Sequence, residues 1–577
     1  MTSKLRSSYV LGINFGGHDT SAALTAGGEL IAACAQERYS LDKHSRKFPI
    51  DAINDCLSLA QLNVSQIDQI AYCNDNRHLI RERYLRPALE NDARIDFLLN
   101  DVERIQYFHN IENRIREETQ FQGQICQYRH HLCHLASAYF PSGYDEALLV
   151  SYDGMGEWET GLFGVGKGGE ITVVDHSNCF PHSLGLVYSA ITFYLGWRHH
   201  CDEGIIMGLA PYGNPDAVIP ESDRSYLSLL EEIIVETGRY AYEVDQSWMD
   251  YFGKRDKWIS EKFLQLMGPK RAPDEEILQH HMDLAAALQQ RLETVVLNQL
   301  TKAREEFGIS RLALSGGVAL NCSMNGKIEA SELFDEIFVQ PASGDDGTAI
   351  GGCYLAHQSL TGTLIPARQH NHYKGHRSSD SKIGNIVESS GLDYTKPVDL
   401  YTQTALHLNE GKIIAWFQGG AEFGPRALGN RSILARPFPA AMKDHINARV
   451  KFREYFRPFA GAVLDEYRPE YFDISQPSPH MLIACQVQES KQSEIPAVVH
   501  IDGSCRVQTV SKDGNPRFFQ LITAFHAVTG IPVILNTSFN VKGQPIVNTP
   551  LQAIETFRST LIDCLVLGDY LFEKEPL

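Results

Sequence analysis

The sequence contains no Cys-x-x-Cys pair, although it has twelve cysteines in 577 residues. Cysteines scattered through so long a chain predict reduced thiols and argue against a disulfide framework or a zinc ribbon. Runs of about 18 uncharged apolar residues are also missing, so we expect no membrane-spanning helix. The apolar run YVLGIN near the N-terminus is too short and too glycine-broken for a secretory signal, and we therefore expect a cytoplasmic protein.

Basic residues are the minority among the charged ones. The chain has 52 Lys and Arg against 71 Asp and Glu, a formal net charge of −19. General binders of nucleic acid or of anionic membranes need a basic surface, so we expect neither partner. One local basic pocket remains compatible with this balance. The length exceeds what a single hydrophobic core holds, which predicts at least two domains.

The N-terminal half contains a repeated pattern of strands and glycine turns. Residues 9–37 read as strand, glycine turn, strand, glycine turn and strand, and residues 147–175 repeat this plan. A third glycine site, SGG, follows an apolar run within residues 311–328. An actin-like nucleotide-binding fold requires such a trio, because glycine turns offer backbone N–H groups to phosphates. Each meander taken alone is more simply explained by ordinary hairpin turns.

A polar segment rich in Gly, Ser, His and Arg separates the two halves of the chain. We predict an actin-like α/β domain over residues 1–358, a linker over 359–382 and a second α/β domain over 383–577. The histidines of the linker are interpreted as solvated side chains.

Two histidines in RHHLCHLASAYF, His130 and His134, are spaced i and i+4 on an expected helix. This spacing places both on one face, where they can share a metal ion. Asp153 and Asp345 follow expected strands near the proposed nucleotide cleft and can complete the set. Two His and two Asp suit iron or manganese better than a structural zinc. A packed, His-rich helix without metal is the alternative.

The roles of two further residues are ambiguous in the sequence. His18 lies in the first glycine turn, where an imidazole can act as general base on an attacking hydroxyl or can merely hydrogen-bond the turn. Lys43, in ERYSLDKHSRKFP, is most simply a surface lysine when judged from the sequence alone.

The C-terminal half carries a dense basic stretch. Between Arg426 and Arg457 there are eight Lys and Arg residues but only Asp444 and Glu454 as acids. These cations are interleaved with Gly, Pro and aromatic residues, which is unusual for a solvated basic face. Several charge-assisted donors in one place indicate a site for a phosphate-bearing ligand. Arginine and polar side chains at later strand ends extend it, namely Arg506, Ser538 and Asn540.

Taken together, the motifs resemble the O-carbamoyltransferase family, which includes the nodulation-factor, cephalosporin and tobramycin carbamoyltransferases. The likeness spans nearly the whole chain through GINFGGHDTSAAL, HHLCHLASAYF, SYDGMGEWE, SGGVALN, SGDDGTAIG, EFGPRALGNRSILA, FREYFRPFA, DGSCRVQTV and LNTSFNVKGQPIV. The resemblance implies an N-terminal actin-like (ASKHA) domain with a duplicated βββαβα unit and a C-terminal YrdC-like α/β domain. It also implies that carbamoyl phosphate and ATP give carbamoyl adenylate, whose carbamoyl group passes to a hydroxyl of a small-molecule, natural-product acceptor.

Roles carried over from the family fall on specific residues. The base falls on His18, an acceptor contact on Lys43, and a divalent metal (iron first, manganese or magnesium as alternatives) on His130, His134, Asp153 and Asp345. Nucleotide contacts fall on Gly16, Gly17, Gly154, Gly316, Gly317 and Asn321. Contacts to carbamoyl phosphate and ATP fall on Arg426, Arg431, Lys451, Arg457, Arg506, Ser538 and Asn540.

The sequence leaves several points open. Ile205 stands where the family often has lysine, and either Asp345 or Asp346 can face the metal. The acceptor and the oligomeric state, including a homodimer, are not defined. An actin-fold small-molecule kinase, or a carbamoyltransferase acting on a protein or tRNA, is the alternative function. A non-catalytic scaffold leaves the His and Asp set unexplained, and the kinase leaves the basic C-terminal half unexplained.

Overall fold

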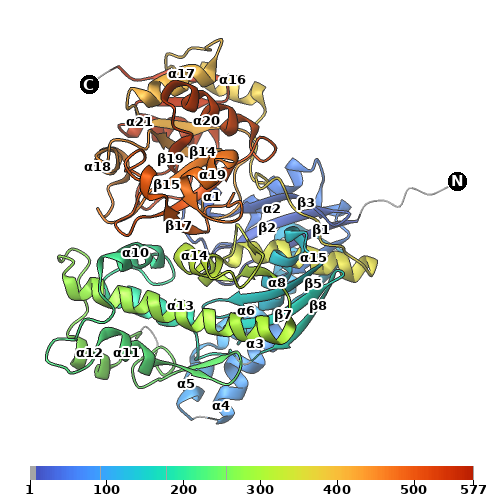
Figure 1. Cartoon of the computed structure of the whole chain (residues 1–577). Helices are drawn as coiled ribbons and strands as arrows, with labels where there is room; N and C mark the ends of the chain where they lie inside the picture. Colours follow the sequence, from blue (N-terminus) through green and yellow to red (C-terminus); the bar gives the residue numbers. More distant parts are fainter. Residues whose placement is uncertain (1–7, 91, 177, 255–256, 576–577) are drawn as a thin grey trace. The chain divides into compact units, whose positions relative to one another are not determined.

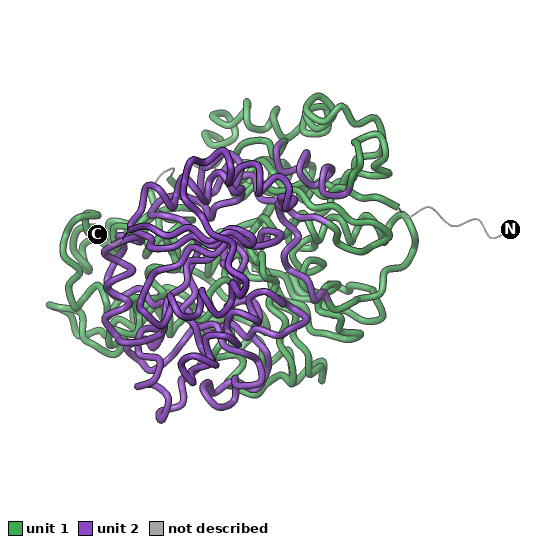
Figure 2. Tube along the Cα trace, turned by 90° about the horizontal axis from the view of Figure 1, so that it is seen from above, with its two compact units in different colours: residues 1–31, 46–50, 61–368 green, residues 32–45, 51–60, 369–577 purple. Residues whose placement is uncertain are grey.

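The computed structural model describes residues 8–90, 92–176, 178–254 and 257–575 as a mixed α/β protein (Figure 1). The chain divides into two compact units (Figure 2). The first contains residues 1–31, 46–50 and 61–368, and the second contains residues 32–45, 51–60 and 369–577. The predicted boundaries did not include the two short N-terminal segments that belong to the second unit.

The first of two five-stranded sheets in the N-terminal half has the order β3-β2-β1-β4-β5. Its strands are β1 (Tyr9–Asn14), β2 (Ser21–Ala26), β3 (Glu29–Ala35), β4 (Gln69–Tyr72) and β5 (Gln124–Gln127). Strand β1 pairs antiparallel with β2 and parallel with β4, and β4 pairs parallel with β5. The central strands are almost wholly apolar because both of their faces are covered.

The second sheet repeats this topology in the order β8-β7-β6-β11-β12. Its strands are β6 (Glu146–Tyr152), β7 (Gly161–Lys167), β8 (Glu170–Asp175), β11 (Arg311–Ser315) and β12 (Glu336–Val339). Again the first strand pairs antiparallel with the second and parallel with the fourth. The duplication predicted from the two glycine-rich meanders is therefore present in the fold.

Thirteen α-helices of the first unit lie between or after these strands in the described ranges. They are α3 (Asn76–Ile80), α4 (Arg86–Glu90), α5 (Ile95–Asn100), α6 (Val102–His109), α7 (Ile111–Thr119), α8 (His130–Ser142), α9 (Leu184–Tyr194), α10 (Glu203–Leu209), α11 (Tyr226–Ile233), α12 (Glu261–Met267), α13 (Gln279–Phe307), α14 (Cys322–Ala330) and α15 (Thr348–Thr361). A small hairpin is formed by β9 (Ile234–Thr237) and β10 (Ala241–Val244). No helix in the described ranges has the length and apolarity needed to cross a membrane.

Glycines let α15 pack closely against α8 and β1. A Cβ on Gly351 would lie 1.8 Å from the carbonyl oxygen of Cys133 in α8. A Cβ on Gly12 in β1 would lie 2.0 Å from the carbonyl oxygen of Ala349. Backbone therefore meets backbone at both contacts, and no larger residue fits without moving an element.

The second unit is built on a sheet with the order β16-β17-β18-β15-β19-β14-β13-β20-β21. Its strands are β13 (Ile414–Phe417), β14 (Arg431–Ala435), β15 (Ala460–Leu464), β16 (Phe472–Asp473), β17 (Ala484–Val487), β18 (Ser504–Val510), β19 (Val533–Ser538), β20 (Cys564–Leu567) and β21 (Tyr570–Glu573). Its helices are α1 (Glu37–Ser40), α2 (Ile50–Leu59), α16 (Asp380–Ser389), α17 (Leu400–Asn409), α18 (Met442–Ile446), α19 (Arg468–Tyr471), α20 (Pro516–Thr529) and α21 (Pro550–Ser559).

Successive side chains of each strand point to opposite sides of the sheet, so the sheet has one hydrophobic cluster on each side. Ile414 and Trp416 of β13 pack with the apolar residues of α17 and α20. Ala415 and Phe417 of the same strand pack with those of α16 and α21. Because successive side chains of a strand point to opposite faces, four consecutive apolar residues indicate a sheet covered on both sides.

Gly351→Ala tests the close packing of α15. The added methyl has no space, so the variant should lose about 1–3 kcal/mol of stability through overpacking. Gly204→Ala is a matched control, since Gly204 lies in α10 with no atom within 4 Å of its ideal Cβ. Urea unfolding of both full-length variants should lower the midpoint only for Gly351→Ala. Equal midpoints would contradict the packing described here.

Candidate active site and cation cluster

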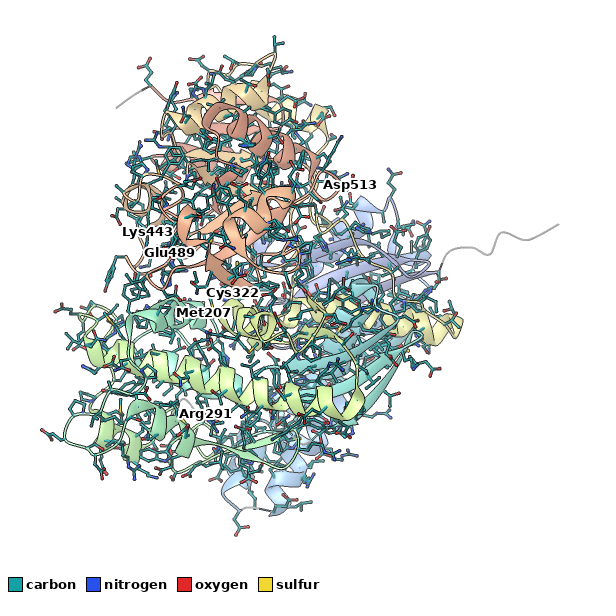
Figure 3. All side chains as sticks on the ribbon, viewed as in Figure 1. Met207, Arg291, Cys322, Lys443, Glu489 and Asp513 are labelled. Atoms are coloured by element: carbon teal, nitrogen blue, oxygen red, sulfur yellow. The ribbon has the colours of Figure 1, made fainter. Side chains whose placement is uncertain are left out.

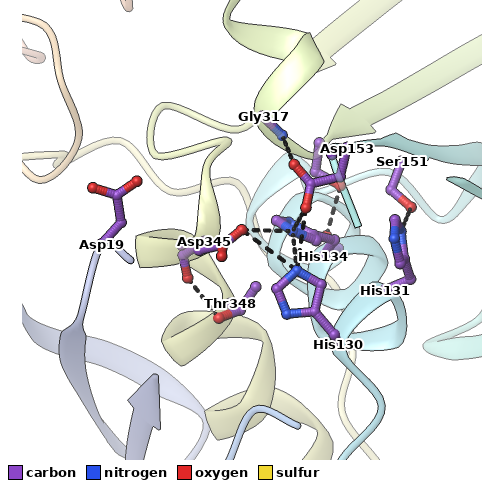
Figure 4. A network of polar contacts seen from close by, with 12 residues as sticks. Asp19, His130, His131, His134, Ser151, Asp153, Gly317, Asp345 and Thr348 are labelled. Atoms are coloured by element: carbon purple, nitrogen blue, oxygen red, sulfur yellow. Dashed lines mark hydrogen bonds and ion pairs between the residues drawn. The ribbon is translucent and has the colours of Figure 1, made fainter. Parts of the chain in front are cut away.

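Four side chains of the first unit converge in one buried cluster (Figure 4). The Nε2 atoms of His130 and His134 lie 3.0 Å apart. An oxygen of Asp153 lies 3.4 Å from Nε2 of His130, and an oxygen of Asp345 lies at the same distance. From Nε2 of His134 the same two oxygens lie 3.7 and 3.8 Å away. The structure thus brings all four predicted ligands together.

Each of these side chains is positioned by its own element. Both histidines lie in the first turns of α8, whose N-terminal residue donates its backbone N–H to Oε1 of the buried Glu157 at 2.9 Å. Asp153 follows β6, and its Oδ1 accepts the backbone N–H of Gly317 at 2.9 Å. Asp345 opens the short turn before α15. The close packing of α15 on α8 therefore also sets the spacing within the cluster.

The charges in the cluster influence one another strongly. Burial lowers the pKa of His130, but the carboxylates of Asp345 and Asp153 outweigh it and raise this pKa well above its usual range. Burial raises the pKa of Asp153, yet hydrogen bonds from both histidines bring it well below its usual range. The two carboxylates thus attract positive charge to the point where the imidazoles meet.

This donor set fits a divalent first-row cation. Two imidazole nitrogens and two carboxylate oxygens face one point, which matches the ligand types that iron and manganese accept. The Nδ1 atoms of both histidines are buried and meet no hydrogen-bonding group in the described part of the chain. Their Nε2 atoms are therefore the ones that meet polar partners. Asp345, and not Asp346, contributes the oxygen to this point.

The neighbouring His131 has a different role. Its Nδ1 lies 2.8 Å from Oγ of Ser151, and its Nε2 lies 2.9 Å from the carbonyl oxygen of Glu159. Burial lowers the pKa of His131 well below its usual range. Both nitrogens are occupied, so this imidazole fastens α8 to the second sheet.

His18 borders the same cluster. It lies half-buried in the turn between β1 and β2, with Nδ1 2.9 Å from Oδ2 of Asp19 and 3.9 Å from Oδ2 of Asp345. Burial lowers its pKa, but Asp345, Asp19 and Asp153 together raise it to about 9. The imidazole is therefore held beside the four-residue cluster by carboxylates.

The glycine turns lie near this cluster as well. Gly16 has a φ of 101°, and an ideal Cβ on Gly17 would lie 3.9 Å from Oδ2 of Asp345. Gly316 has a φ of 87°, and a Cβ there would lie 2.1 Å from the carbonyl oxygen of Tyr152. Gly154 directly follows Asp153. These turns expose backbone where side chains would block close approach.

Three other positions discussed in the sequence analysis lie in different surroundings. Asn321 caps α14 through the backbone N–H of Met324 and exchanges two hydrogen bonds with Gln289 at 2.9 and 3.0 Å. Lys43 is exposed and belongs to the second compact unit. Ile205, where lysine was expected, is a buried apolar residue of α10.

In the second unit, Lys451 joins two other predicted residues. Its ammonium group donates to Oδ1 of Asn540 at 2.9 Å, to the carbonyl oxygen of Asn540 at 3.1 Å and to the carbonyl oxygen of Ser538. Oγ of Ser538 in turn donates to Oδ1 of Asn540 at 2.7 Å. Burial and the charges of Arg453 and Arg457 lower the pKa of Lys451 well below its usual range.

Arg453 extends this cation cluster, which we define as Lys451, Arg453, Arg457 and Arg506. Its guanidinium lies 4.1 Å over the ring of Phe459, and its Nε donates to Oδ1 of Asn447 at 3.2 Å. Burial, Arg457 and Arg506 lower its pKa well below the usual range. Arg453 was not among the predicted site residues, because nothing in the sequence separates it from its basic neighbours.

Little negative charge faces this cluster. Glu454 lies 3.5 Å from Arg457 and 3.7 Å from Lys542. Nε of Arg506 is buried without a hydrogen-bond partner in the described part of the chain. Arg426, on the β13–β14 loop, is half-buried. Buried cations whose pKa is lowered by neighbouring cations, as for Lys451 and Arg453, are suited to bind an anion.

Arg431 makes different contacts. It is fully buried, and its guanidinium donates to the backbone carbonyl oxygens of Gln418, Gly419, Asn430, His376 and Asn548. It also stacks 3.6 Å from the ring of Phe417. Because its donors are occupied by backbone, Arg431 fixes loops and has no hydrogen left for a ligand.

Comparison with known proteins agrees with the sequence motifs. Residues 9–354 match the family model Carbamoyltransferase N-terminus, and residues 405–574 match Carbamoyltransferase C-terminus. Nodulation protein NolNO of Sinorhizobium fredii is 37% identical and is matched over 96% of this chain and 79% of its own length. The uncharacterized protein sll1178 of Synechocystis sp. is 36% identical over 98% of this chain and 97% of its own.

The (R)-2-hydroxyglutaryl-CoA dehydratase component A of Acidaminococcus fermentans, a solved structure, covers 61% of this chain and 98% of its own. Its identity is 13% and its TM-score 0.32, a likeness too weak to support any conclusion. The two family models together cover most of the chain, and the NolNO match extends over 575 residues. The chain therefore belongs to the carbamoyltransferase family.

Proposed function

We propose that this carbamoyltransferase uses carbamoyl phosphate and ATP to carbamoylate a hydroxyl group of a small-molecule acceptor. The observation that supports it best is the presence of two charged sites of opposite character in a chain of this family. The first unit holds a cluster of two imidazoles and two carboxylates. The second unit holds four cations with little compensating negative charge.

The second unit, which we interpret as YrdC-like, is the proposed site of activation. Water hydrolyses carbamoyl phosphate to carbamate and phosphate. An oxygen of carbamate then attacks the α-phosphate of ATP to give carbamoyl adenylate and pyrophosphate. Both substrates carry several negative charges, which the cation cluster and Arg426 would neutralise. Ser538 and Asn540 supply hydrogen-bonding groups beside Lys451. Arg431 is left out of the ligand contacts because backbone carbonyls occupy its donors.

The first unit, with its duplicated sheets, is the proposed actin-like site of transfer. Backbone N–H groups of Gly16, Gly17, Gly154 and Gly316 would hold the adenylate phosphate. Gly317, whose own N–H is donated to Asp153, and Asn321 would lie nearby. A divalent ion bound by the four-residue cluster supplies positive charge that stabilises AMP as a leaving group. The same ion would offset the carboxylates that raise the pKa of His18, so that a neutral His18 could take the proton of the acceptor hydroxyl as that oxygen attacks the carbamoyl carbon. Products are the acceptor carbamate and AMP. A contact of Lys43 with the acceptor stays a prediction.

The acceptor class and the setting complete the proposal. A natural-product alcohol acted on in the cytoplasm agrees with the family, with the acidic net charge and with the lack of a membrane-spanning helix among the described residues. Neither nucleic acid nor membrane is needed as a partner.

The metal content tests the four-residue cluster. The purified protein should hold about one divalent first-row ion per chain, and His134→Ala and Asp345→Asn should lose it because each removes one of few ligands. Asp346→Asn is the matched control, since Asp346 is the neighbour of Asp345 but lies outside the cluster. Elemental analysis measures all four proteins. An ion content that is equal in Asp345→Asn and Asp346→Asn would remove this site from the proposal.

Pyrophosphate release tests the cation cluster. Arg457→Ala and Arg426→Ala should each slow release that depends on carbamoyl phosphate by about ten- to hundredfold, because a charge-assisted hydrogen bond contributes about 1.5–3 kcal/mol. Lys512→Ala removes an exposed cation of the same unit and should release pyrophosphate at the wild-type rate. Near-normal release from both arginine variants would show that activation does not occur at this cluster.

His18→Ala separates the two half-reactions. The variant should still release pyrophosphate, while carbamoylation of any alcohol that the wild type accepts should fall about 100- to 10,000-fold, the usual effect of losing a general base. Product is quantified at increasing ATP and with preformed carbamoyl adenylate. Full recovery of transfer under either condition would mean that His18 only braces the glycine turn and supports nucleotide binding.

A further inference from the structure

Three ring side chains of the first unit lie beside His18, and the proposed reaction does not yet use them. His200, in the loop between α9 and α10, has its ring centroid 5.8 Å from that of His18. Trp258, which precedes α12, has its ring centroid 5.1 Å from that of His200 and 4.3 Å from that of His199. We call His199, His200 and Trp258 the ring cluster. Two segments that are far apart in the sequence thus meet next to the proposed base.

The ring cluster can be reached from solvent. Each of its three side chains is half-buried, and the side chain of His18 is 34% exposed. Single exposed apolar side chains are ordinary on a protein surface. Three rings in mutual contact are different, because together they offer a flat apolar face that a second ring can cover. Their place beside His18 makes the acceptor the natural occupant.

The backbone at His200 is held in an unfavourable conformation. Its φ of 57° lies in the left-handed region, which residues with a side chain rarely adopt. The N–H of His200 donates to Oε1 of Glu203 at 2.6 Å, and the N–H of Asp202 donates to the carbonyl oxygen of Arg198 at 3.0 Å. Glycine would fit this turn without strain, yet the sequence has an imidazole. Strained residues of this kind concentrate at binding and catalytic sites.

Both segments are anchored to the rest of the unit. Helix α10 follows the strained turn, and Sδ of its Met207 lies 3.8 Å from Sγ of Cys322 in α14 (Figure 3). The carbonyl oxygen of Trp258 accepts the N–H of Asp250 at 3.2 Å, and Met249 and Ile259 form a β-bridge. The rings are therefore positioned by the fold itself.

The surroundings favour an uncharged ligand. Burial and the neighbouring His18 and His199 lower the pKa of His200 to about 3, so its imidazole is uncharged. Oε1 of Glu203 accepts the hydroxyl of Ser189 at 2.6 Å as well as the N–H of His200. Asp250 accepts the ammonium group of Lys254 at 2.9 Å. A cationic ligand would have to compete for carboxylates that already have partners.

We propose that the ring cluster binds the acceptor of the carbamoyl group, and that this acceptor is an uncharged alcohol with a flat ring next to its hydroxyl. The ring covers the indole of Trp258, and the hydroxyl then points toward His18. The imidazole of His200, between the two, hydrogen-bonds a polar group of the acceptor. The flat face is that of an aromatic ring or the C–H face of a sugar ring. This inference rests on the proposed function and names the substrate class of its transfer site.

Binding of model alcohols to the full-length protein tests the ring cluster without any turnover. Benzyl alcohol and methyl β-glucopyranoside represent the two kinds of ring, 1-hexanol is the flexible apolar control, and 4-(aminomethyl)benzyl alcohol is the cationic one. Ligand-observed NMR titrations use wild type, Trp258→Leu and Trp258→Phe. Tyr394→Leu is the matched control, because Tyr394 is a 40% exposed ring of the second unit.

Wild type and Tyr394→Leu should bind at least one of the two ring alcohols equally well, and the one that binds identifies the kind of ring. Trp258→Leu should bind it about five- to tenfold more weakly, and Trp258→Phe should recover most of the loss because it restores a flat face. Hexanol and the cationic alcohol should bind more weakly than the ring alcohol. Failure of both ring alcohols to bind wild type would overturn the inference. Equal binding by wild type and Trp258→Leu, or tighter binding of either control alcohol, would overturn it too.

His200→Gly tests the strained turn. Glycine adopts the left-handed conformation freely, so the thermal unfolding midpoint should not fall. Loss of the imidazole should weaken binding of the ring alcohol about three- to tenfold, as for one hydrogen bond. Unchanged binding would show that His200 does not contact the acceptor. Pyrophosphate release should match wild type in every ring-cluster variant, whereas a wild type that releases none refutes the proposed function and leaves the binding result to decide the ring cluster.

Discussion

Burial of two carboxylates beside two imidazoles is the constraint on which the first unit depends. Asp153 and His134 are almost or wholly buried, and an uncompensated ion at that depth costs several kcal/mol. The cluster therefore has to be assembled with accurate spacing. Three contacts set this spacing. The N–H of Gly317 donates to Asp153, the first N–H of α8 donates to Glu157, and Gly351 lets α15 pack closely against α8. Fold and candidate chemistry are fixed by the same contacts.

In the second unit the buried charges are positive. Lys451 and Arg453 are cations in poorly solvated positions, and neighbouring cations lower the pKa of each further. Such an arrangement is costly for the free protein and is relieved by a polyanionic ligand. Arg431 is also buried, which lowers its pKa to about 9, but backbone carbonyls occupy its donors. Arg431 therefore holds loops, whereas Lys451, which donates to Ser538 and Asn540, contributes its positive charge to the cation cluster.

The sequence predicted the parts of the molecule that depend on local spacing. Repeated glycine-rich meanders predicted the duplicated sheets, and the i, i+4 spacing of His130 and His134 predicted that they share a face. Spacing could not choose between Asp345 and Asp346, because the choice depends on how the turn before α15 is oriented. Nor could it separate Arg431 from Arg457, since the burial of a side chain arises only from tertiary packing.

Exchange of labelled pyrophosphate into ATP tests the central claim most directly, because it requires reversible adenylate formation and no acceptor. We expect exchange that depends on carbamoyl phosphate and proceeds without ADP formation. Exchange that is absent, or ATP consumption that yields ADP as in a kinase, would contradict carbamoyl adenylate formation by this protein.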